Sequence, residues 1–329
     1  MYIRGMGHYV PQRILDNDEL STMVDTNDEW IRTRTGIRQR HVAAEGEACS
    51  DLAFNAAVGA LEASGLAPEA VTHIIVSTVS GDAAFPATAT TVQKRLGIAN
   101  AMSFDLGAAC SGYLYGLELS RGLLALDPRS VILLVGAEVL THYVDWQDRG
   151  TCVLFGDGAG ASVLCASPSE KESARGALVE GVLCEGSAEG GELLHCVAGG
   201  TRRPFAVGDV VDPDSRIRMN GREVFKLAVR AMSGVSQRLL DTLGLTVDDI
   251  DLVVPHQANS RIIQGVLNRV GIAEDKVFLN LDKYGNTSAA SIPLALSEAL
   301  EQGAIRPGMR VLLSTFGAGL SWASAVLRY

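Results

Sequence analysis

Short runs of valine, isoleucine and leucine alternate along this chain with longer segments of helical periodicity. Near-continuous apolar runs of this length are typical of strands that are buried on both faces of a sheet. Such runs occupy residues 73–77, 130–135, 251–255 and 310–314. Amphipathic segments between them predict helices over residues 51–64, 112–126, 223–243 and 291–302. This alternation indicates a layered α/β protein.

The chain also repeats itself at a nearly constant spacing. Three segments of its first part recur 179, 174 and 180 residues further on. The matched segments begin at Gly65 and Gly244, at Arg95 and Arg269, and at Val131 and Val311. The repeat predicts two duplicated halves, residues 1–168 and 169–329, joined by a polar connector over residues 166–175. Residues 185–217 are rich in glycine, aspartate and proline with little periodicity, so we expect a loop there.

Composition narrows the class of protein. The 329 residues are 47% hydrophobic and 20% charged, with a mean hydropathy of +0.18, which is enough for a large core and excludes a disordered chain. The net charge of −10 makes the whole chain a poor binder of nucleic acid, although a local basic patch can still meet an acidic partner.

Cysteine usage and the chain's apolar stretches suggest a compartment. The six cysteines contain no C-x-x-C pair, which argues against a metal cluster or a disulfide framework and favours a reducing environment. No apolar segment of signal-peptide length precedes Pro11, so we expect no export. The uncharged stretch over residues 311–327 is too short and too polar to span a bilayer. We therefore expect a cytoplasmic protein that needs neither a membrane nor a metal ion.

Cys110 is the first candidate for chemistry. It lies in a turn of small residues that runs directly into a helical pattern. At a helix start, unpaired backbone N–H groups and the helix dipole favour the thiolate, which is the form that attacks a carbonyl. The alternative is that Cys110 is a small core residue, because free cysteines are among the most buried residue types.

His256 and Asn286 lie in the other half of the chain. His256 follows the predicted strand 251–255, and Asn286 lies in the segment that matches the Cys110 turn. A duplicated α/β fold brings strand ends and helix starts from both halves to one place. An asparagine amide donates a hydrogen bond without titrating. Singly, these residues fit a surface histidine and a helix cap; together with Cys110 they form a Cys-His-Asn set.

A basic stripe stands out against the acidic composition. Arg222, Lys226 and Arg230 recur every four residues on one predicted helix, and Arg261 follows His256 on the next helix. A solvated helix face explains such a run, and so does a docking surface for an acidic protein. Both interpretations remain open on the charges alone.

At this point the chain resembles, over essentially its whole length, the thiolase-like condensing enzymes, and within them the beta-ketoacyl-acyl-carrier-protein synthase III family. The carrying motifs are Asp28-Glu-Trp-Ile-Arg-Thr-Arg-Thr-Gly-Ile, Ala109-Cys-Ser-Gly, Asp148-Arg-Gly-Thr, Phe155-Gly-Asp-Gly-Ala-Gly-Ala, Met219-Asn-Gly, His256-Gln-Ala-Asn, Tyr284-Gly-Asn-Thr-Ser-Ala and Phe316-Gly-Ala-Gly-Leu-Ser-Trp. Elongating synthases carry Cys-His-His and thiolases Cys-His-Cys, so Asn286 selects the synthase III pattern.

The resemblance implies a five-layered αβαβα fold, a homodimer, and the initiation of type II fatty acid synthesis. An acyl-CoA, with acetyl-CoA as the expected primer, would acylate Cys110 and release CoA. Backbone N–H groups of Cys110 and Ala318 would form the oxyanion hole. His256 and Asn286 would then hold malonyl-acyl-carrier protein while it loses carbon dioxide and attacks the acyl group. Decarboxylation supplies the carbanion, so no metal or redox cofactor is expected.

The resemblance also assigns binding residues. Trp30 and Arg149 would flank the adenine of CoA, with Arg34 near its phosphates. Phe85 would reach across the dimer to help bound the acyl pocket. The positions of Lys226 and Arg261 serve the family as a dock for the acidic carrier protein, beside Arg222 and Arg230.

Two other functions compete with this prediction. A related acyltransferase or ketide synthase of specialised metabolism would use the same three residues. A non-catalytic partner subunit would lack the nucleophile, whereas Cys110 is present. The length of the 185–217 segment leaves the choice of primer open among acetyl, propionyl, branched and longer acyl groups.

Overall fold

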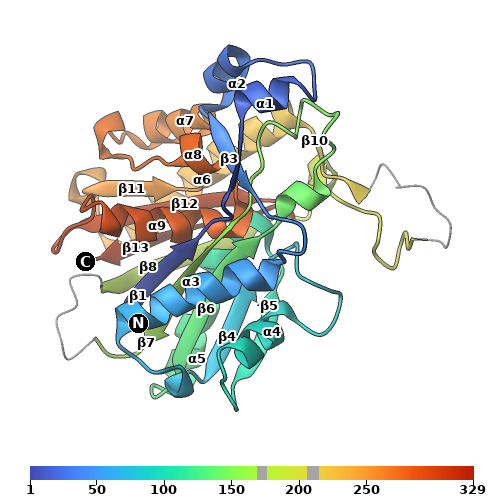
Figure 1. The fold of residues 1–329 in the computed structure, drawn as a ribbon. Helices are drawn as coiled ribbons and strands as arrows, with labels where there is room; N and C mark the ends of the chain where they lie inside the picture. Colours follow the sequence, from blue (N-terminus) through green and yellow to red (C-terminus); the bar gives the residue numbers. More distant parts are fainter. Residues whose placement is uncertain (169–175, 206–214) are drawn as a thin grey trace.

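The computed structural model describes residues 1–168, 176–205 and 215–329, and in these ranges it is built around a sheet of nine strands (Figure 1). The sheet comprises β1 (Tyr2–Tyr9), β4 (His73–Ser77), β5 (Met102–Leu106), β6 (Val131–Glu138), β7 (Gly158–Cys165), β8 (Ala177–Gly186), β11 (Leu252–Pro255), β12 (Arg310–Gly317) and β13 (Ser321–Arg328). Two small antiparallel pairs lie outside it: β2 (Arg13–Asp16) with β3 (Gln39–Val42), and β9 (Leu194–His195) with β10 (Arg218–Met219).

The order of the strands repeats about the centre of the sheet. The first strand group runs β5-β4-β6-β7-β1, and the second runs β8-β13-β12-β11 away from it. In each group the inner strands pair antiparallel and the outer ones parallel. The groups join where β1 pairs with β8, through Tyr2 with Leu178 and Ile3 with Ala177. A single parallel bridge from Val253 to Val277 continues the second group beyond β11.

The described helices are α1 (Asn17–Ser21), α2 (Asp28–Thr35), α3 (Cys49–Ser64), α4 (Thr88–Arg95), α5 (Gly112–Leu126), α6 (Gly221–Leu243), α7 (Ser260–Val270), α8 (Leu281–Tyr284) and α9 (Ser291–Glu301). Six of them form three layers around the two strand groups, whereas α1, α2 and α8 contact mainly each other, α7 or the β2–β3 pair. Helices α3 and α4 cover the outer face of the first group, and α6, with α7 against it, covers the second. Helices α5 and α9 lie between the groups and contact strands of both. The predicted five-layered αβαβα fold is thus confirmed.

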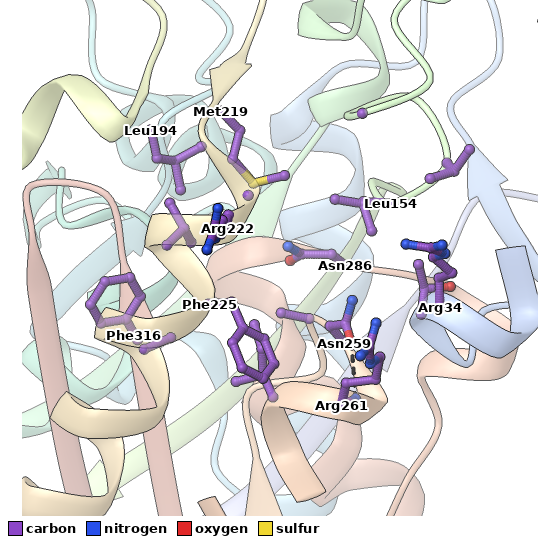
Figure 2. A pocket seen from close by; sticks show the side chains of 18 of the residues that line it. Arg34, Leu154, Leu194, Met219, Arg222, Phe225, Asn259, Arg261, Asn286 and Phe316 are labelled. Atoms are coloured by element: carbon purple, nitrogen blue, oxygen red, sulfur yellow. Dashed lines mark hydrogen bonds between the residues drawn. The ribbon is translucent and has the colours of Figure 1, made fainter. Parts of the chain in front are cut away.

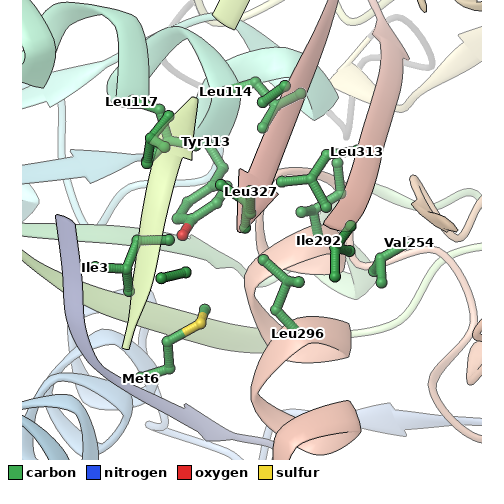
Figure 3. Packing of buried hydrophobic residues seen from close by; sticks show 14 of the residues in the cluster. Ile3, Met6, Tyr113, Leu114, Leu117, Val254, Ile292, Leu296, Leu313 and Leu327 are labelled. Carbon is green, nitrogen blue, oxygen red and sulfur yellow. The ribbon is translucent and has the colours of Figure 1, made fainter. Parts of the chain in front are cut away.

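The middle layer explains why α5 and α9 carry so many apolar residues. Tyr113 and Leu117 of α5 and Ile292 and Leu296 of α9 are at most 2% exposed (Figure 3). They pack against Leu313 and the other apolar side chains of the strands on either side. A helix that is covered on several sides loses its polar face, since burying unpaired polar groups costs free energy. The starts of these two helices are therefore held inside the protein, where the strand groups meet.

The hydrophobic pattern predicted the regular elements within a few residues. The four predicted strands are β4, β6, β11 and β12, and the four predicted helices are α3, α5, α6 and α9. The expected loop over residues 185–217 is partly ordered: it holds the end of β8, all of β9 and a short 3-10 turn, and residues 206–214 lie outside the described residues.

The uncharged stretch at residues 311–327 forms β12 and β13, and none of the described helices combines the length and apolarity needed to cross a membrane. Residues 169–175 of the predicted connector lie outside the described part of the chain, and the division into halves at residue 168 stays a prediction.

Candidate active site

Cys110 lies in a short 3-10 turn between β5 and α5. This turn contacts the hairpin formed by β12 and β13. The Thr315 hydroxyl donates to the Cys110 carbonyl at 2.9 Å. The neighbouring Ser111 hydroxyl donates to the Ser321 carbonyl at 3.0 Å. These bonds join residues more than 200 positions apart, so the turn that carries Cys110 is held by the second strand group.

Glycine allows the two backbones to approach. A Cβ atom at Gly317 would lie 2.8 Å from the Cys110 nitrogen and 3.2 Å from its Cβ. Real Cβ contacts of this kind begin near 3.4 Å, so any larger residue must displace the turn. The Phe316-Gly-Ala-Gly motif therefore brings the end of β12 against the sulfur-bearing residue.

The turn that precedes α9 is the counterpart of the Cys110 turn. Ala109 and Ser288 are the non-glycine residues with positive φ in the described chain, at 44° and 49°. Each stands three residues before a central helix, and the helix starts at Gly112 and Ser291 are 179 residues apart, the spacing of the sequence repeat. Strained backbone of this kind persists where surrounding structure holds it, often at functional sites.

The structure contradicts the prediction of a thiolate at Cys110. Burial raises the pKa of its thiol to about 12; a hydrogen bond with Ser288 and one from its own amide lower it, and the nearby Glu138 carboxylate raises it further. A helix start contributes about 0.3–2 kcal/mol. Burial of a charged group away from water shifts its pKa by several units, so the effect of desolvation on the Cys110 thiol exceeds that of the helix start. Cys110 therefore carries a protonated thiol near neutral pH.

His256 follows β11 directly, at the carboxyl end of the strand. Its backbone N–H donates to the Ser314 carbonyl at 2.8 Å, which extends the ladder by one residue. The side chain is 4% exposed, and burial lowers the pKa of the imidazole to about 4. The ring is therefore neutral near pH 7. Its Nδ1 atom is buried without a hydrogen-bond partner in the described structure.

Gln257 holds this segment in place, a role that its sequence position did not reveal. Its backbone N–H donates to the Ser291 hydroxyl at 2.7 Å, and its side-chain amide donates to the carbonyls of Pro255 and Phe278. Its Oε1 accepts the Asn280 N–H at 3.1 Å. The motif His256-Gln-Ala-Asn thus contains its own positioning residue.

Asn286 is clamped through its backbone and oriented through its side chain. Its N–H donates to the Leu154 carbonyl at 2.8 Å, and its carbonyl accepts the Gly156 N–H at 3.1 Å. Its Oδ1 accepts the Ser288 N–H at 2.9 Å. Since the oxygen is engaged, the Nδ2 group is left to donate to a ligand.

One cavity of about 640 Å³ is lined by all three candidate residues, Cys110, His256 and Asn286, although Cys110 follows β5, His256 follows β11 and Asn286 precedes α9. Figure 2 shows Asn286 in this cavity, with Asn259 and Phe225 nearby. The cavity is also lined by six residues that we predicted to bind CoA or the carrier protein: Trp30, Arg34, Arg149, Arg222, Lys226 and Arg261. Residues that we did not predict include Asn259, Phe225 and Phe316, of which Asn259 and Phe316 belong to motifs already quoted.

The mouth of the cavity carries a cluster of an indole and two guanidinium groups. The Cζ atoms of Arg149 and Arg34 lie 4.8 and 5.3 Å from the centre of the Trp30 ring. Arg149 also donates to the Asp25 carbonyl at 3.0 Å. A purine between Trp30 and Arg149 needs about 7 Å, twice the usual contact distance, so Arg149 has to move for such a ligand to enter.

The predicted basic stripe divides in two. Arg222, Lys226 and Arg261 line the cavity rim, whereas Arg230 is exposed one turn further along α6 and does not line it. Lys226 pairs with Glu223 at 2.7 Å, and both side chains are about half exposed. Such a pair contributes little to stability and exchanges readily for another partner.

A second cavity of about 310 Å³ adjoins the other side of Cys110. Ala318 and Ser288 line it, together with apolar side chains such as Leu140 and Ile217. Phe85 does not line it and is 86% exposed on the loop before α4. No group of three or more histidine, cysteine, aspartate or glutamate side chains among the described residues is arranged to hold a metal ion.

Comparison with known proteins gives a consistent result. Family models described as 3-oxoacyl-[acyl-carrier-protein] synthase III match residues 104–179, and those of its C-terminal part match residues 240–329. A protein named beta-ketoacyl-[acyl-carrier-protein] synthase III from Nitratidesulfovibrio vulgaris strain DP4 is 52% identical over 327 residues, covering 99% of this chain and 98% of the relative.

Solved structures agree over the same length. The 3-oxoacyl-[acyl-carrier-protein] synthase III of Aquifex aeolicus superimposes with a TM-score of 0.90 at 41% identity, covering 99% of both chains. The synthase III of Thermus thermophilus gives 0.89 at 45% identity, covering 99% of this chain and 98% of that one. The similarity therefore extends over the whole fold and includes the segments that line the cavity.

Proposed function

The chain belongs to the beta-ketoacyl-[acyl-carrier-protein] synthase III family, and on that premise we propose that Cys110, His256 and Asn286 are its catalytic residues. It is an acyltransferase-type condensing enzyme of fatty acid biosynthesis. The observation that carries the proposal is that these three side chains, from three separate segments of the chain, line one cavity. The reaction joins a short acyl-CoA, acetyl-CoA in our proposal, to malonyl-acyl-carrier protein and gives a 3-oxoacyl-carrier protein, carbon dioxide and CoA.

The first step transfers the primer to Cys110. The sulfur attacks the thioester carbonyl, the carbon–sulfur bond to CoA breaks, and CoA leaves as a thiol. Backbone N–H groups of Cys110 and Ala318 hold the developing oxyanion, a role supported by the approach of the Gly317 backbone to Cys110. The cavity beside Ala318 receives the acyl chain.

The second step forms the new carbon–carbon bond. His256 and Asn286 donate hydrogen bonds to the thioester oxygen of malonyl-carrier protein, so that its enolate is stabilised as carbon dioxide leaves. A neutral His256 suits this role, because an unpaired acceptor at the buried Nδ1 costs less than an unpaired donor and so places the proton on Nε2. The carbanion then attacks the acyl-Cys110 carbonyl and the carbon–sulfur bond to Cys110 breaks. The sulfur that leaves takes up a proton, which restores the resting thiol.

The residues that bind the CoA and carrier-protein parts of the substrates lie at the rim of the cavity. Trp30 and Arg149 hold the adenine of CoA after Arg149 leaves Asp25, and Arg34 faces the phosphates. Lys226 and Arg261, with Arg222 and the more distant Arg230, receive the acidic carrier protein. Their position at the rim supports this, because the carrier's prosthetic arm must enter from the surface.

We also propose a homodimer that works without metal or redox cofactor. The edge strand β5 leaves backbone groups unpaired, and Met102 and Phe85 nearby are 57% and 86% exposed. Exposed edges and large apolar side chains are usually covered by a partner. A second copy would cover β5 and bring its Phe85 toward the acyl cavity of the first.

A panel of acyl-CoA primers tests the proposed function. The enzyme is mixed with malonyl-carrier protein and each primer, and mass spectrometry reads the carrier-bound product. We expect a 3-oxoacyl-carrier protein, formed fastest from acetyl-CoA and with loss of carbon dioxide. Products on CoA or a free acid, with none on the carrier, would instead indicate a ketide synthase or acyltransferase of specialised metabolism.

A further inference from the structure

Glu298 is a buried carboxyl group to which the mechanism above gives no role. It lies on α9, is 7% exposed and lines neither of the two cavities described above. Every residue of α9 from Ser291 to Ala299 is buried. A carboxylate in such a helix is costly unless several donors reach it, so the groups that bond to Glu298 indicate what it does.

The two oxygens of Glu298 accept hydrogen bonds from different neighbours. Oε2 accepts from the Asn280 side-chain amide at 2.8 Å. Oε1 accepts from the Lys283 ammonium group and, over a longer 3.4 Å, from the Tyr284 hydroxyl. Gln302, at the end of α9, also donates to Oε1, at 2.9 Å. All four partners are donors, so the site is built for an ionised carboxylate, which only accepts.

The bond to Asn280 connects Glu298 with the segment that carries His256. The Asn280 backbone N–H donates to Oε1 of Gln257 at 3.1 Å, and Gln257 directly follows His256 in the chain. Asn280 itself is 2% exposed. One buried asparagine therefore holds Glu298 through its side chain and the His256 segment through its backbone.

The bonds to the end of α8 connect Glu298 with Asn286. Tyr284 is the last residue of α8, and only Gly285 separates it from Asn286. Gly285 has a φ of 66°, and a Cβ atom there would lie 2.8 Å from the Leu154 carbonyl oxygen. This connection is short and tightly packed, so a shift at the end of α8 is passed on to Asn286.

We propose that Glu298 is a positioning residue that sets the spacing of His256 and Asn286 for the condensation step. The inference rests on the proposed function, in which both side chains donate to one thioester oxygen. Two donors meet at one oxygen over a narrow range of positions, and a misplacement of about 1 Å costs on the order of 100-fold in rate. Cys110 is held by separate bonds from the β12–β13 hairpin, such as that from Thr315. Glu298 thus governs decarboxylation and leaves acylation unaffected.

Glu298→Gln separates the two steps. Its amide would turn its oxygen to the Lys283 ammonium group, which leaves its N–H groups facing the Asn280 amide, donor against donor. Lys283 is 42% exposed, so the loss of its ionic partner strands no buried charge. We expect acylation of Cys110 by acetyl-CoA to stay within about threefold of wild type. Release of carbon dioxide from malonyl-carrier protein should slow at least about tenfold, through kcat rather than KM.

A swap variant and a matched control show whether the donor–acceptor pairing is responsible. Glu298→Gln combined with Asn280→Asp moves the carboxylate to the other side of the bond, so that a donor again faces an acceptor. We expect this double variant to decarboxylate faster than Glu298→Gln alone. Gln302→Leu removes a bond to the same carboxylate without changing the contacts to the His256 or Asn286 segments. It should decarboxylate within about twofold of wild type, with a similar melting temperature.

The outcomes distinguish this inference from the proposed function. A loss of less than tenfold in folded Glu298→Gln would overturn the inference, as would equal slowing of both steps or a double variant no faster than Glu298→Gln. Decarboxylation at the wild-type rate in Asn286→Ala would instead refute the proposed function itself. If Glu298→Gln does not fold, Lys283→Met replaces it with the same expected separation of the two steps, because it removes a donor to the same carboxylate.

Discussion

Gly317→Ala tests how closely the end of β12 must approach Cys110, the proposed nucleophile. The added Cβ would lie 2.8 Å from the Cys110 nitrogen, about 0.6 Å closer than the 3.4 Å at which ordinary contact begins. The atoms that it meets are backbone atoms of a turn tied down by Thr315, so the turn itself must move. A misplacement of about 1 Å costs on the order of 100-fold in rate, so we expect acylation to slow by at least about tenfold.

Stability should change much less than activity. Overpacking of this size costs about 1–3 kcal/mol, which lowers the melting temperature of a chain this long by only a few degrees. The assay is single-turnover acylation by acetyl-CoA, followed by intact mass, beside a melting curve.

Gly122→Ala is the control within α5, where a Cβ meets nothing within 4 Å. It should leave acylation unchanged and stabilise the helix by about 0.5–1 kcal/mol. Acylation by Gly317→Ala within twofold of wild type would refute the close-approach argument.

The other predictions concern the remaining parts of the site. Asn286→Ala should still be acylated on Cys110 but should release no carbon dioxide from malonyl-carrier protein; equal loss of both steps would argue against this division of roles. Lys226→Glu with Arg261→Glu should raise the KM for malonyl-carrier protein more than tenfold at low salt and leave acylation by acyl-CoA unchanged, whereas an unchanged KM would make the stripe a solvated face. His256 holds a pKa of about 4 in the fold against about 6.5 unfolded, so from pH 6.5 down to 4 the unfolded chain gains a proton that the folded chain refuses. The free energy of unfolding, measured with denaturant, should therefore fall by up to about 3 kcal/mol more in wild type than in His256→Gln between pH 6.5 and 4. The same pH dependence in both proteins would contradict this prediction.

The sequence could predict the elements that bury apolar surface and the residues that share a motif. The helix predicted over residues 112–126 is α5 with the same bounds, because its apolar residues recur at helical spacing and the helix starts at Gly112 and is followed by Asp127. The sequence could also indicate that Cys110, His256 and Asn286 lie together, because each stands near a strand end or a helix start and parallel strands bring such ends to one edge. Their catalytic roles stay a prediction.

What depends on long-range packing could not be predicted. The thiol of Cys110 is protonated because segments distant in the sequence bury it. The position of Cys110 at a helix start says nothing about that burial. In the sequence Glu138 is simply a residue that follows an apolar run. Only the fold shows that it accepts a hydrogen bond from the Ser288 hydroxyl, 150 positions away. The expected loop over residues 185–217 contains strand and turn because its partners lie in β13 and β10.

A pulse–chase experiment on Cys110 tests the central claim most directly. Wild-type enzyme is loaded with isotope-labelled acetyl-CoA, freed of unbound primer, and chased with unlabelled malonyl-carrier protein. The label should first appear as a single acetyl group on the Cys110 peptide and then pass, in equal amount, to the 3-oxoacyl carrier protein. Label that stays on Cys110 during product formation, or that reaches the product in Cys110→Ala, would contradict a covalent path through this residue.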